Sequence, residues 1–205
     1  MTGEPWDGLD ETYLHATNPR GGSGFRGDEA RWSRARRVIV DAIDRDGTFL
    51  DVGCANGLLM ESVRTWAAER GHAIEPYGVE ASPRLAELAR SRLPAWAGRI
   101  AVGDARTWGP HDPTRGFDFV RTELEYAWPA ERASMIEALL RRAVAPDGRL
   151  IVCSYGTASS GVETVEPVAG PLRAWGFTVA GEAESRDANG VRFTRIAWID
   201  GPARA

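Results

Sequence analysis

The chain of 205 residues carries 25 basic and 29 acidic residues, a formal net charge of −4 and 43% hydrophobic residues. This length and composition are typical of one globular domain with its own hydrophobic core. The mildly acidic balance, with a pI near 5.5, disfavours broad nucleic-acid binding, which usually needs a basic face.

All the basic residues are arginine, because the sequence contains no lysine. This absence excludes Schiff-base enzymes, pyridoxal-phosphate enzymes and phosphate-loop ATPases, since each of these needs a lysine. The composition also suits a bacterial genome of high GC content.

Two cysteines, Cys54 and Cys153, have neither a CxxC partner nor metal-ligand spacing. They predict reduced thiols and no metal site. No N-terminal apolar signal region occurs, and no apolar run approaches the ~20 residues that span a bilayer. We therefore expect a soluble, cytoplasmic protein without a membrane partner.

Residues 1–27 are poor in aliphatic side chains, and the stretch NPRGGSGFRG over 18–27 predicts irregular structure. Its aromatic residues Trp6, Tyr13 and Phe25 could close over a ligand. We therefore expect 1–27 to form a mobile N-terminal lid or substrate-binding segment, followed by the main domain over 28–205.

The main domain is expected to begin with a helix that Asp28 caps, since apolar residues recur at helical spacing as far as Ile43. This helix contains the run RWSRARR over 31–37. Arg31, Arg34 and Arg37 would lie along one side, a pattern that favours a solvated polar face over an anion or RNA patch.

Strands and helices then alternate along the chain. The predicted strands are 48–52, 73–80, 100–104, 117–121 and 148–156, and the predicted helices are 58–70, 83–93 and 129–144. Ser82 is expected to cap the second of these helices, with Pro83 at its first position. Parallel neighbouring strands need crossover connections, so this order predicts a parallel sheet with helices on both faces.

The C-terminal part breaks the alternation. A helix ends near residue 177, and two strand-like runs then flank RDANGV, whose Asn-Gly pair is a strong hairpin signal. The predicted fold is therefore α/β, a single doubly wound sheet of seven mostly parallel strands with an antiparallel C-terminal hairpin.

The first strand leads into DVGCANG over 51–57. Gly53 and Gly57 let the backbone approach a ligand, and the following helix offers free N–H groups. In open α/β sheets ligands bind outside the carboxyl ends of the strands, where the strand order reverses. A dinucleotide turn would read G-x-G-x-x-G, so the spacing here disfavours NAD.

Polar residues also end the next three strands. Glu80 could accept both hydroxyls of a ribose, each bond contributing roughly 1.5–3 kcal/mol. Asp104 could accept from an exocyclic amine, and RTELEY over 121–126 would lie beside the reactive end of such a ligand. Their order at four successive strand ends is more informative than any one of them.

This combination resembles the class I S-adenosylmethionine-dependent methyltransferase family over roughly residues 30–200. Two features depart from the family pattern: Ala55 stands where glycine is common, and the interval from Asp51 to Glu80 is longer than usual. The resemblance implies S-adenosylmethionine as cofactor and S-adenosylhomocysteine as product. It implies cofactor binding by Asp51, Gly53, Cys54, Ala55, Gly57, Glu80, Ala81, Asp104, Ala105, Arg121 and Thr122.

The resemblance also implies a role for each part of this set. Asp51 would orient the turn and bind the methionine amino group, and Glu80 would bind the ribose hydroxyls. Asp104 would meet the adenine amine, while Arg121 and Thr122 would flank the methionine moiety. Ala81 and Ala105 would lie near the adenine.

Methyl transfer from a sulfonium is an in-line displacement to which a protein contributes mainly alignment and desolvation. A base is needed only when the acceptor must lose a proton. The candidates are Glu123, Glu125 and Tyr126 after the fourth strand, and His15 in the N-terminal segment. We expect at most one of Glu123 and Glu125 to face the pocket.

In the family that the chain resembles, enzymes that methylate amides or the amino groups of bases carry an N/D-P-P-Y/W sequence after the fourth strand. This chain has no such sequence there, and no added domain offers a macromolecule-binding surface. We therefore expect a small-molecule acceptor, methylated on O or N and bound by 1–27, 123–129 and 155–167. The oligomeric state stays open. The alternatives are a non-catalytic, cofactor-binding protein of this fold and, less favoured, an NAD-type Rossmann oxidoreductase.

Overall fold

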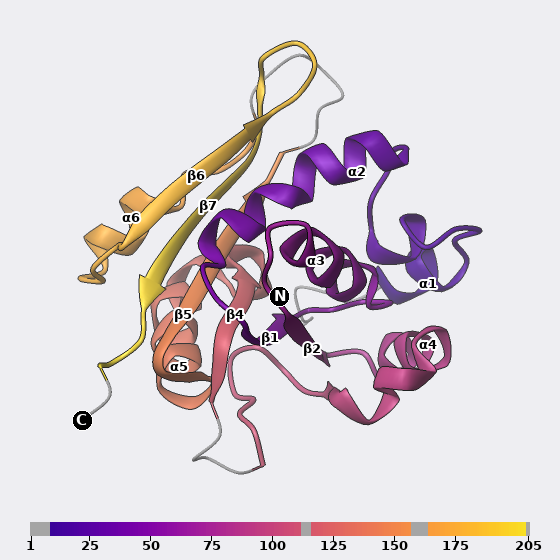
Figure 1. The fold of residues 1–205 in the computed structure, drawn as a ribbon, viewed down its shortest axis with the longest axis horizontal. Coiled ribbons are helices and arrows are strands. Elements are labelled where there is room, and N and C mark those ends of the chain that lie inside the picture. The colour runs from indigo at the N-terminus through magenta and orange to yellow at the C-terminus, as the bar shows by residue number, and fades with distance from the viewer. Residues whose placement is uncertain (1–8, 112–115, 157–163, 204–205) are drawn as a thin grey trace.

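The computed structural model describes residues 9–111, 116–156 and 164–203. Its centre is a seven-stranded sheet with the order β3-β2-β1-β4-β5-β7-β6 (Figure 1). The strands are β1 Gly47–Val52, β2 Ile74–Glu80, β3 Ile100–Val102, β4 Phe117–Glu123, β5 Val144–Tyr155, β6 Gly181–Arg186 and β7 Arg192–Asp200.

Neighbouring strands from β3 to β5 run parallel, and β7 runs antiparallel to both β5 and β6. The predicted fold class is confirmed, including the C-terminal hairpin. Only β7 is reversed, because β6 pairs with the outer edge of β7 and so runs in the direction of β5.

Helices cover both faces of the sheet. The α-helices are α1 Leu9–Leu14, α2 Glu29–Arg36, α3 Leu58–Ala68, α4 Pro83–Arg92, α5 Arg132–Arg142 and α6 Ala169–Ala174. Short 3-10 helices are η1 Gly21–Ser23, η2 Arg37–Ala42, η3 Pro94–Arg99, η4 Leu124–Tyr126 and η5 Pro129–Glu131. No helix in the described part of the chain is long and apolar enough to cross a membrane.

The strands are apolar on both faces because each face has its own helical layer. Phe49 of β1 and Phe119 of β4 pack into a core with α2, η2 and α3. Their neighbours Leu50 and Val120 point the opposite way, into a core with α5 and α6. Alternate side chains of one strand therefore anchor opposite layers.

Both predicted helix caps are present. The side chain of Asp28 accepts from Arg31 N at 2.8 Å, and that of Ser82 accepts from Leu85 N at 3.3 Å. Pro83 occupies the first turn of α4. These caps set where the backbone enters the two helices that border the site.

Several elements differ from the predicted ones, and the differences near the strand ends affect the site. Helix α1 was not expected from the sequence; its Glu11 carboxylate forms an ion pair with Arg84 of α4 at 2.5 Å. The helix after Asp28 tightens into η2 from Arg37. Strand β4 runs on to Glu123, and β3 ends at Val102, ahead of Asp104.

Candidate functional site

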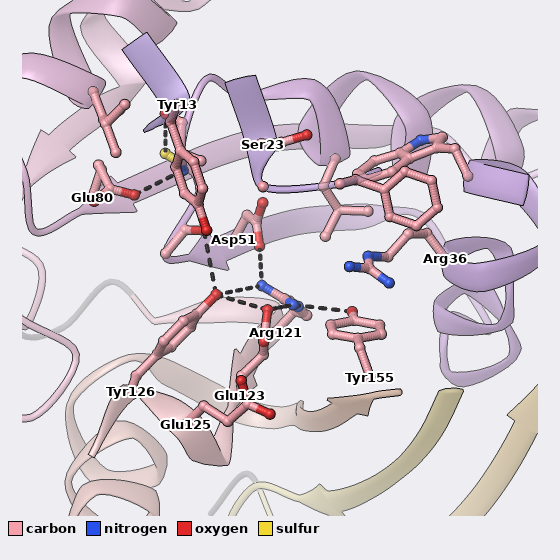
Figure 2. Close-up of a pocket in the computed structure, with 18 of the residues that line it drawn as sticks. Tyr13, Ser23, Arg36, Asp51, Glu80, Arg121, Glu123, Glu125, Tyr126 and Tyr155 are labelled. Carbon is pink, nitrogen blue, oxygen red and sulfur yellow. Dashed lines mark hydrogen bonds and ion pairs between the residues drawn. The ribbon is translucent and has the colours of Figure 1, made fainter. Parts of the chain in front are cut away.

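A cavity of about 630 Å³ opens at the carboxyl ends of the central strands (Figure 2). The chain proceeds from β1 through β2 to β3 on one side and then returns to place β4 on the other side of β1. This reversal is where open α/β sheets bind ligands. The volume lies within the roughly 300–1,000 Å³ of small-molecule sites.

The turn after β1 is held in a left-handed conformation. Gly53, Ala55 and Gly57 have φ of 76°, 46° and 77°. The N–H groups of Gly53 and Cys54 both donate to the Val79 carbonyl, at 2.7 and 3.0 Å, and so fasten the turn to β2. An alanine at a positive φ costs about 1–2 kcal/mol, a physical reason why glycine suits the position of Ala55.

Glu80 fastens the same turn from the end of β2. Its Oε2 accepts from Ala55 N at 2.8 Å and its Oε1 accepts from Ser82 N at 3.0 Å. The side chain lines the cavity although the residue is only 9% exposed. A carboxylate has about four acceptor positions, so two backbone bonds are compatible with ribose binding.

Asp51 and Arg121 form a buried ion pair at the point where the strand order reverses. Strand pairing sets them opposite each other on β1 and β4, and Asp51 Oδ1 lies 3.1 Å from Arg121 Nη1. Burial raises the pKa of Asp51 to about 7, although Arg121 opposes the shift. The partner predicted for Asp51 was the methionine amino group, and the structure adds a cation of the protein itself.

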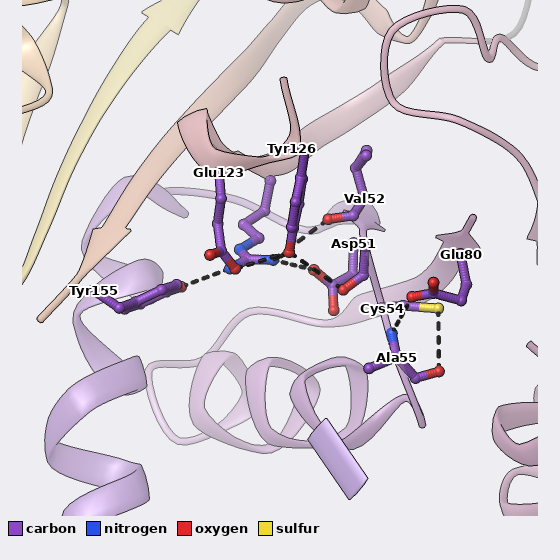
Figure 3. Close-up of polar contacts among 10 residues, drawn as sticks. Asp51, Val52, Cys54, Ala55, Glu80, Glu123, Tyr126 and Tyr155 are labelled. Carbon is purple, nitrogen blue, oxygen red and sulfur yellow. Dashed lines mark hydrogen bonds and ion pairs between the residues drawn. The ribbon is translucent and has the colours of Figure 1, made fainter. Parts of the chain in front are cut away.

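The Arg121 guanidinium, labelled in Figure 2, links the pair to further polar side chains. Figure 3 labels these side chains, which are Glu123, Tyr126 and Tyr155. Its Nη1 donates to Tyr126 Oη at 3.2 Å and its Nη2 donates to Tyr155 Oη at 3.0 Å. It also forms an ion pair with Glu123. Tyr126 Oη in turn donates to Glu123 Oε1 at 2.8 Å. Burial raises the pKa of Tyr126 well above its ordinary value, so the phenol stays protonated at neutral pH.

Glu123 and Glu125 both line the cavity, so the expectation that at most one would face it was wrong. The reason is that β4 continues through Glu123, and the chain then tightens into η4. Glu125 lies on the exposed rim of the cavity. Partial burial of its carboxyl, together with repulsion from Glu123, raises the pKa of Glu125.

Most of the predicted site residues come together in the cavity wall. They are Asp51, Gly53, Cys54, Ala55, Glu80, Ala81, Ala105, Arg121, Glu123 and Tyr126. Four predicted residues lie outside that wall: His15, Gly57, Asp104 and Thr122.

These four residues have other surroundings. His15 is exposed and contacts Glu11 at 3.1 Å. Asp104 Oδ2 lies 2.6 Å from Arg106 Nη2, and its pKa is lowered because bonds to Arg106 outweigh partial burial. Thr122 is fully buried between two residues that face the cavity, as alternation along β4 requires. Gly57 precedes α3, where a Cβ would come within 2.5 Å of the Leu93 side chain.

Part of the wall lies outside the predicted set of site residues. The N-terminal segment contributes Tyr13 and Phe25, two of the aromatic residues expected to close over a ligand, and Ser23, which was not predicted. Helix α2 contributes Arg31, which was expected on a solvated face, and Arg36, which was not predicted. A helical projection of α2 predicts the position of these two arginines. Arg31 and Arg36 flank the buried stripe of Trp32 and Ala35, whereas Arg34 lies on the exposed side. Among the described residues no His, Cys, Asp and Glu cluster is arranged to hold a metal ion.

Residues 49–148 match a protein family described as a methyltransferase domain. None of the curated proteins matches the chain. N-methyltransferase NodS from Bradyrhizobium japonicum WM9, solved with S-adenosyl-L-homocysteine, superposes with a TM-score of 0.66 at 15% identity, over 98% of this chain and 100% of that chain.

Two further solved structures share the fold. A chain from the Haloferax volcanii complex that contains the Trm112 methyltransferase activator has a TM-score of 0.66 at 17% identity, covering 96% of this chain and 98% of that one. The [4+2]-cyclase SpnF has a TM-score of 0.57 at 18% identity, covering 84% and 81%. These low identities show likeness of fold alone.

The family match begins in β1 and extends into β5, so it contains the glycine turn, Glu80 and the Asp51–Arg121 pair that line the cavity. The chain contains a methyltransferase domain over 49–148, and its fold is that of the class I, Rossmann-like S-adenosylmethionine-dependent methyltransferases.

Proposed function

We propose that the chain methylates a small-molecule acceptor bound beside the cofactor in this cavity. S-adenosylmethionine is the cofactor of the family and supplies an electrophilic methyl group. The observation that supports a small acceptor is that the chain's own N-terminal segment forms part of the cavity wall. Tyr13, Ser23 and Phe25 line the cavity together with residues at the strand ends, around a space of about 630 Å³.

The residues present fit the cofactor at its two polar ends. At one end Glu80 faces the cavity and would bind the ribose hydroxyls, next to Ala81 and Ala105 at the adenine. At the other end Asp51 would hold the methionine ammonium. The glycine turn between them has the left-handed backbone that lets a ligand approach its N–H groups.

The polar residues of β4 and η4 would have two roles, which are to hold Arg121 in place and to accept a proton from the acceptor. Glu123 and Tyr126 hold the Arg121 guanidinium in place against Asp51. Glu125 is the base we favour for an acceptor that must lose a proton, because its raised pKa brings it closer to neutrality and it borders the open side of the cavity. His15, an earlier candidate for this step, lies outside the cavity wall.

We also propose that 1–27 acts as a lid for the domain over 28–205. Asn56 of the glycine turn donates its Nδ2 to the Pro19 carbonyl at 2.7 Å, so the segment is fastened to the cofactor side of the site. Trp6 and residues 157–163 belong to the predicted acceptor-binding segments but lie outside the described residues. The cytoplasmic location and bacterial origin stay predictions from composition.

Transfer of a labelled methyl group tests the proposal. The protein is incubated with methyl-labelled S-adenosylmethionine and a cell extract that has been divided by ultrafiltration into small molecules and macromolecules. We expect label in the small-molecule fraction, and much less with Glu80→Gln. Label confined to the macromolecular fraction would contradict the small acceptor. Cofactor binding without any transfer would favour the alternative of a protein of this fold that does not transfer methyl groups. The [4+2]-cyclase SpnF is named for another reaction and has this fold.

A further inference from the structure

Two arginines of α2 line the cavity without a carboxylate partner. Arg31 and Arg36 are both half-buried. Among the described residues neither guanidinium forms an ion pair or a hydrogen bond; each contacts only aromatic rings. A half-buried guanidinium has lost part of its hydration, so its donors need acceptors from elsewhere.

The aromatic contacts hold both groups without using their donors. The Arg36 guanidinium lies 3.3 Å from the ring centroid of Tyr155, and that of Arg31 lies 5.1 Å from the ring centroid of Phe193. Stacking engages the flat face of a guanidinium, whereas its five N–H bonds point outward in the plane. The two side chains are therefore held in place with their hydrogen-bonding edges available.

Missing partners are not a general property of the arginines in this acidic chain. Arg37, the next residue after α2, forms an ion pair with Glu69. Arg121, which lines the same cavity, is paired with both Asp51 and Glu123. Among the described arginines without an ion pair or hydrogen bond, Arg26, Arg34 and Arg64 are exposed to solvent. Arg31 and Arg36 differ from them because they are half-buried in one side of the cavity wall.

That side lies away from the ribose-binding end proposed above. In Figure 2 Glu80 and Arg36 lie at opposite sides of the site, with Asp51 between them. Arg31 and Arg36 come from α2, and their ring partners come from β5, β7, the N-terminal segment and α2 itself rather than from the glycine turn. An acceptor must reach the methyl group on the sulfur of the cofactor, which lies between its ribose and its amino-acid chain. We place the rest of the acceptor on this side of the cavity, away from Glu80.

We propose that Arg31 and Arg36 bind an oxyanion of the acceptor, a carboxylate or a phosphate, on an apolar body that packs against the surrounding rings. The inference rests on the proposed function, since it identifies the chemical class of that same acceptor. Arginine donors bind such anions in a planar, bidentate manner, and partial burial strengthens these charge-assisted bonds.

The test uses matched probes with the full chain. Benzoate and phenyl phosphate carry the two anions on one ring, and benzamide is the neutral counterpart of benzoate. Each is titrated by NMR into the protein with and without S-adenosylhomocysteine. The variants are Arg31→Gln/Arg36→Gln and, as control, Arg34→Gln, which removes a charge from the exposed side of the same helix.

We expect at least one anion to bind the wild type roughly tenfold more tightly than benzamide. The preferred anion identifies the group as carboxylate or phosphate. Arg31→Gln/Arg36→Gln should remove the preference, and Arg34→Gln should keep it. Equal binding of anions and benzamide, no anion binding, or a preference that survives in the double variant would overturn the proposal.

The carboxylate of the cofactor is the competing ligand for these arginines. If Arg31→Gln/Arg36→Gln weakens S-adenosylhomocysteine but not 5′-methylthioadenosine, which lacks the amino-acid end, the pair serves the cofactor and the proposal is wrong. Failure of the wild type to bind S-adenosylhomocysteine would instead refute the proposed function, and the titrations without cofactor would still decide whether an anion site exists.

Discussion

Replacing Gly53 by alanine tests the role of the glycine turn against a control in the same chain. Gly53 and Gly71 have similar left-handed conformations, with φ of 76° and 88°. A Cβ on Gly53 would lie 2.4 Å from Tyr126 Cζ and 2.5 Å from its Oη, whereas nothing lies within 4 Å of a Cβ on Gly71. The two substitutions share the backbone strain and differ in the clash.

The structure sets the expected magnitudes. An L side chain in the left-handed region costs about 1–2 kcal/mol, and this is the whole loss expected for Gly71→Ala. Gly53→Ala adds overpacking of about 1–3 kcal/mol, because Tyr126 must leave its bonds with Glu123 and Arg121 to make room. The variant should therefore lose roughly 2–5 kcal/mol of unfolding free energy.

Urea unfolding followed by tryptophan fluorescence measures both losses. In a Tyr126→Ala background the ring is gone, so Gly53→Ala should cost no more than Gly71→Ala. The affinity for S-adenosylhomocysteine should fall in Gly53→Ala but not in Gly71→Ala, since only the alanine at position 53 places a methyl group in the cavity wall. Equal losses of stability in the two single variants, and no change on removing Tyr126, would refute the close packing on which the prediction rests.

Three further predictions concern the central strands. The pKa of Asp51 rises from its ordinary 3.8 to about 7 on folding, so the folded state holds the proton more tightly than the unfolded state. The free energy of unfolding of the wild type should therefore fall as pH rises from ~4 through ~7, and Asp51→Asn should lose this dependence. If the unfolding free energies of the two proteins, measured with urea, change in parallel with pH, the assignment is wrong. Arg121→Met removes the partner of both Asp51 and Glu123. Above the pKa of Asp51, where that carboxyl is ionised in the wild type, it should destabilise by about 3–5 kcal/mol, against little change for exposed Arg34→Met. Equal urea midpoints at that pH would refute the buried pair. Thr122 Oγ1 has no hydrogen-bond partner among the described residues, so Thr122→Val should keep S-adenosylhomocysteine affinity and leave stability equal or up to about 1 kcal/mol higher; weaker binding by calorimetry would restore Thr122 to the cofactor site.

Local signals predicted the parts of the fold that depend on local chemistry. The caps at Asp28 and Ser82 are read from residue type and the apolar periodicity that follows. The hairpin after Asp187 is read from Asn-Gly, and the parallel sheet from the alternation of elements. The glycine turn and Glu80 could be placed in one site because carboxyl ends of parallel strands meet at one edge.

The remaining features depend on tertiary pairing that no local pattern encodes. The Asp51–Arg121 contact follows from the register between β1 and β4, which are far apart in the sequence. The burial of Arg31 requires the N-terminal segment and β7 to pack beside α2, and that of Arg36 requires the N-terminal segment and β5. Glu123 and Glu125 share the cavity because pairing with β5 extends β4 as far as Glu123, opposite Cys153.

Calorimetric titration of S-adenosylhomocysteine into the wild type and Glu80→Gln, with NAD as the comparison ligand, tests the central claim most directly. The claim is that this cavity binds the adenosyl cofactor through the turn and Glu80. We predict one site per chain for S-adenosylhomocysteine, no binding of NAD, and at least ~tenfold weaker cofactor binding by a folded Glu80→Gln variant. Binding of NAD in place of S-adenosylhomocysteine, or an affinity unchanged by Glu80→Gln, would contradict it.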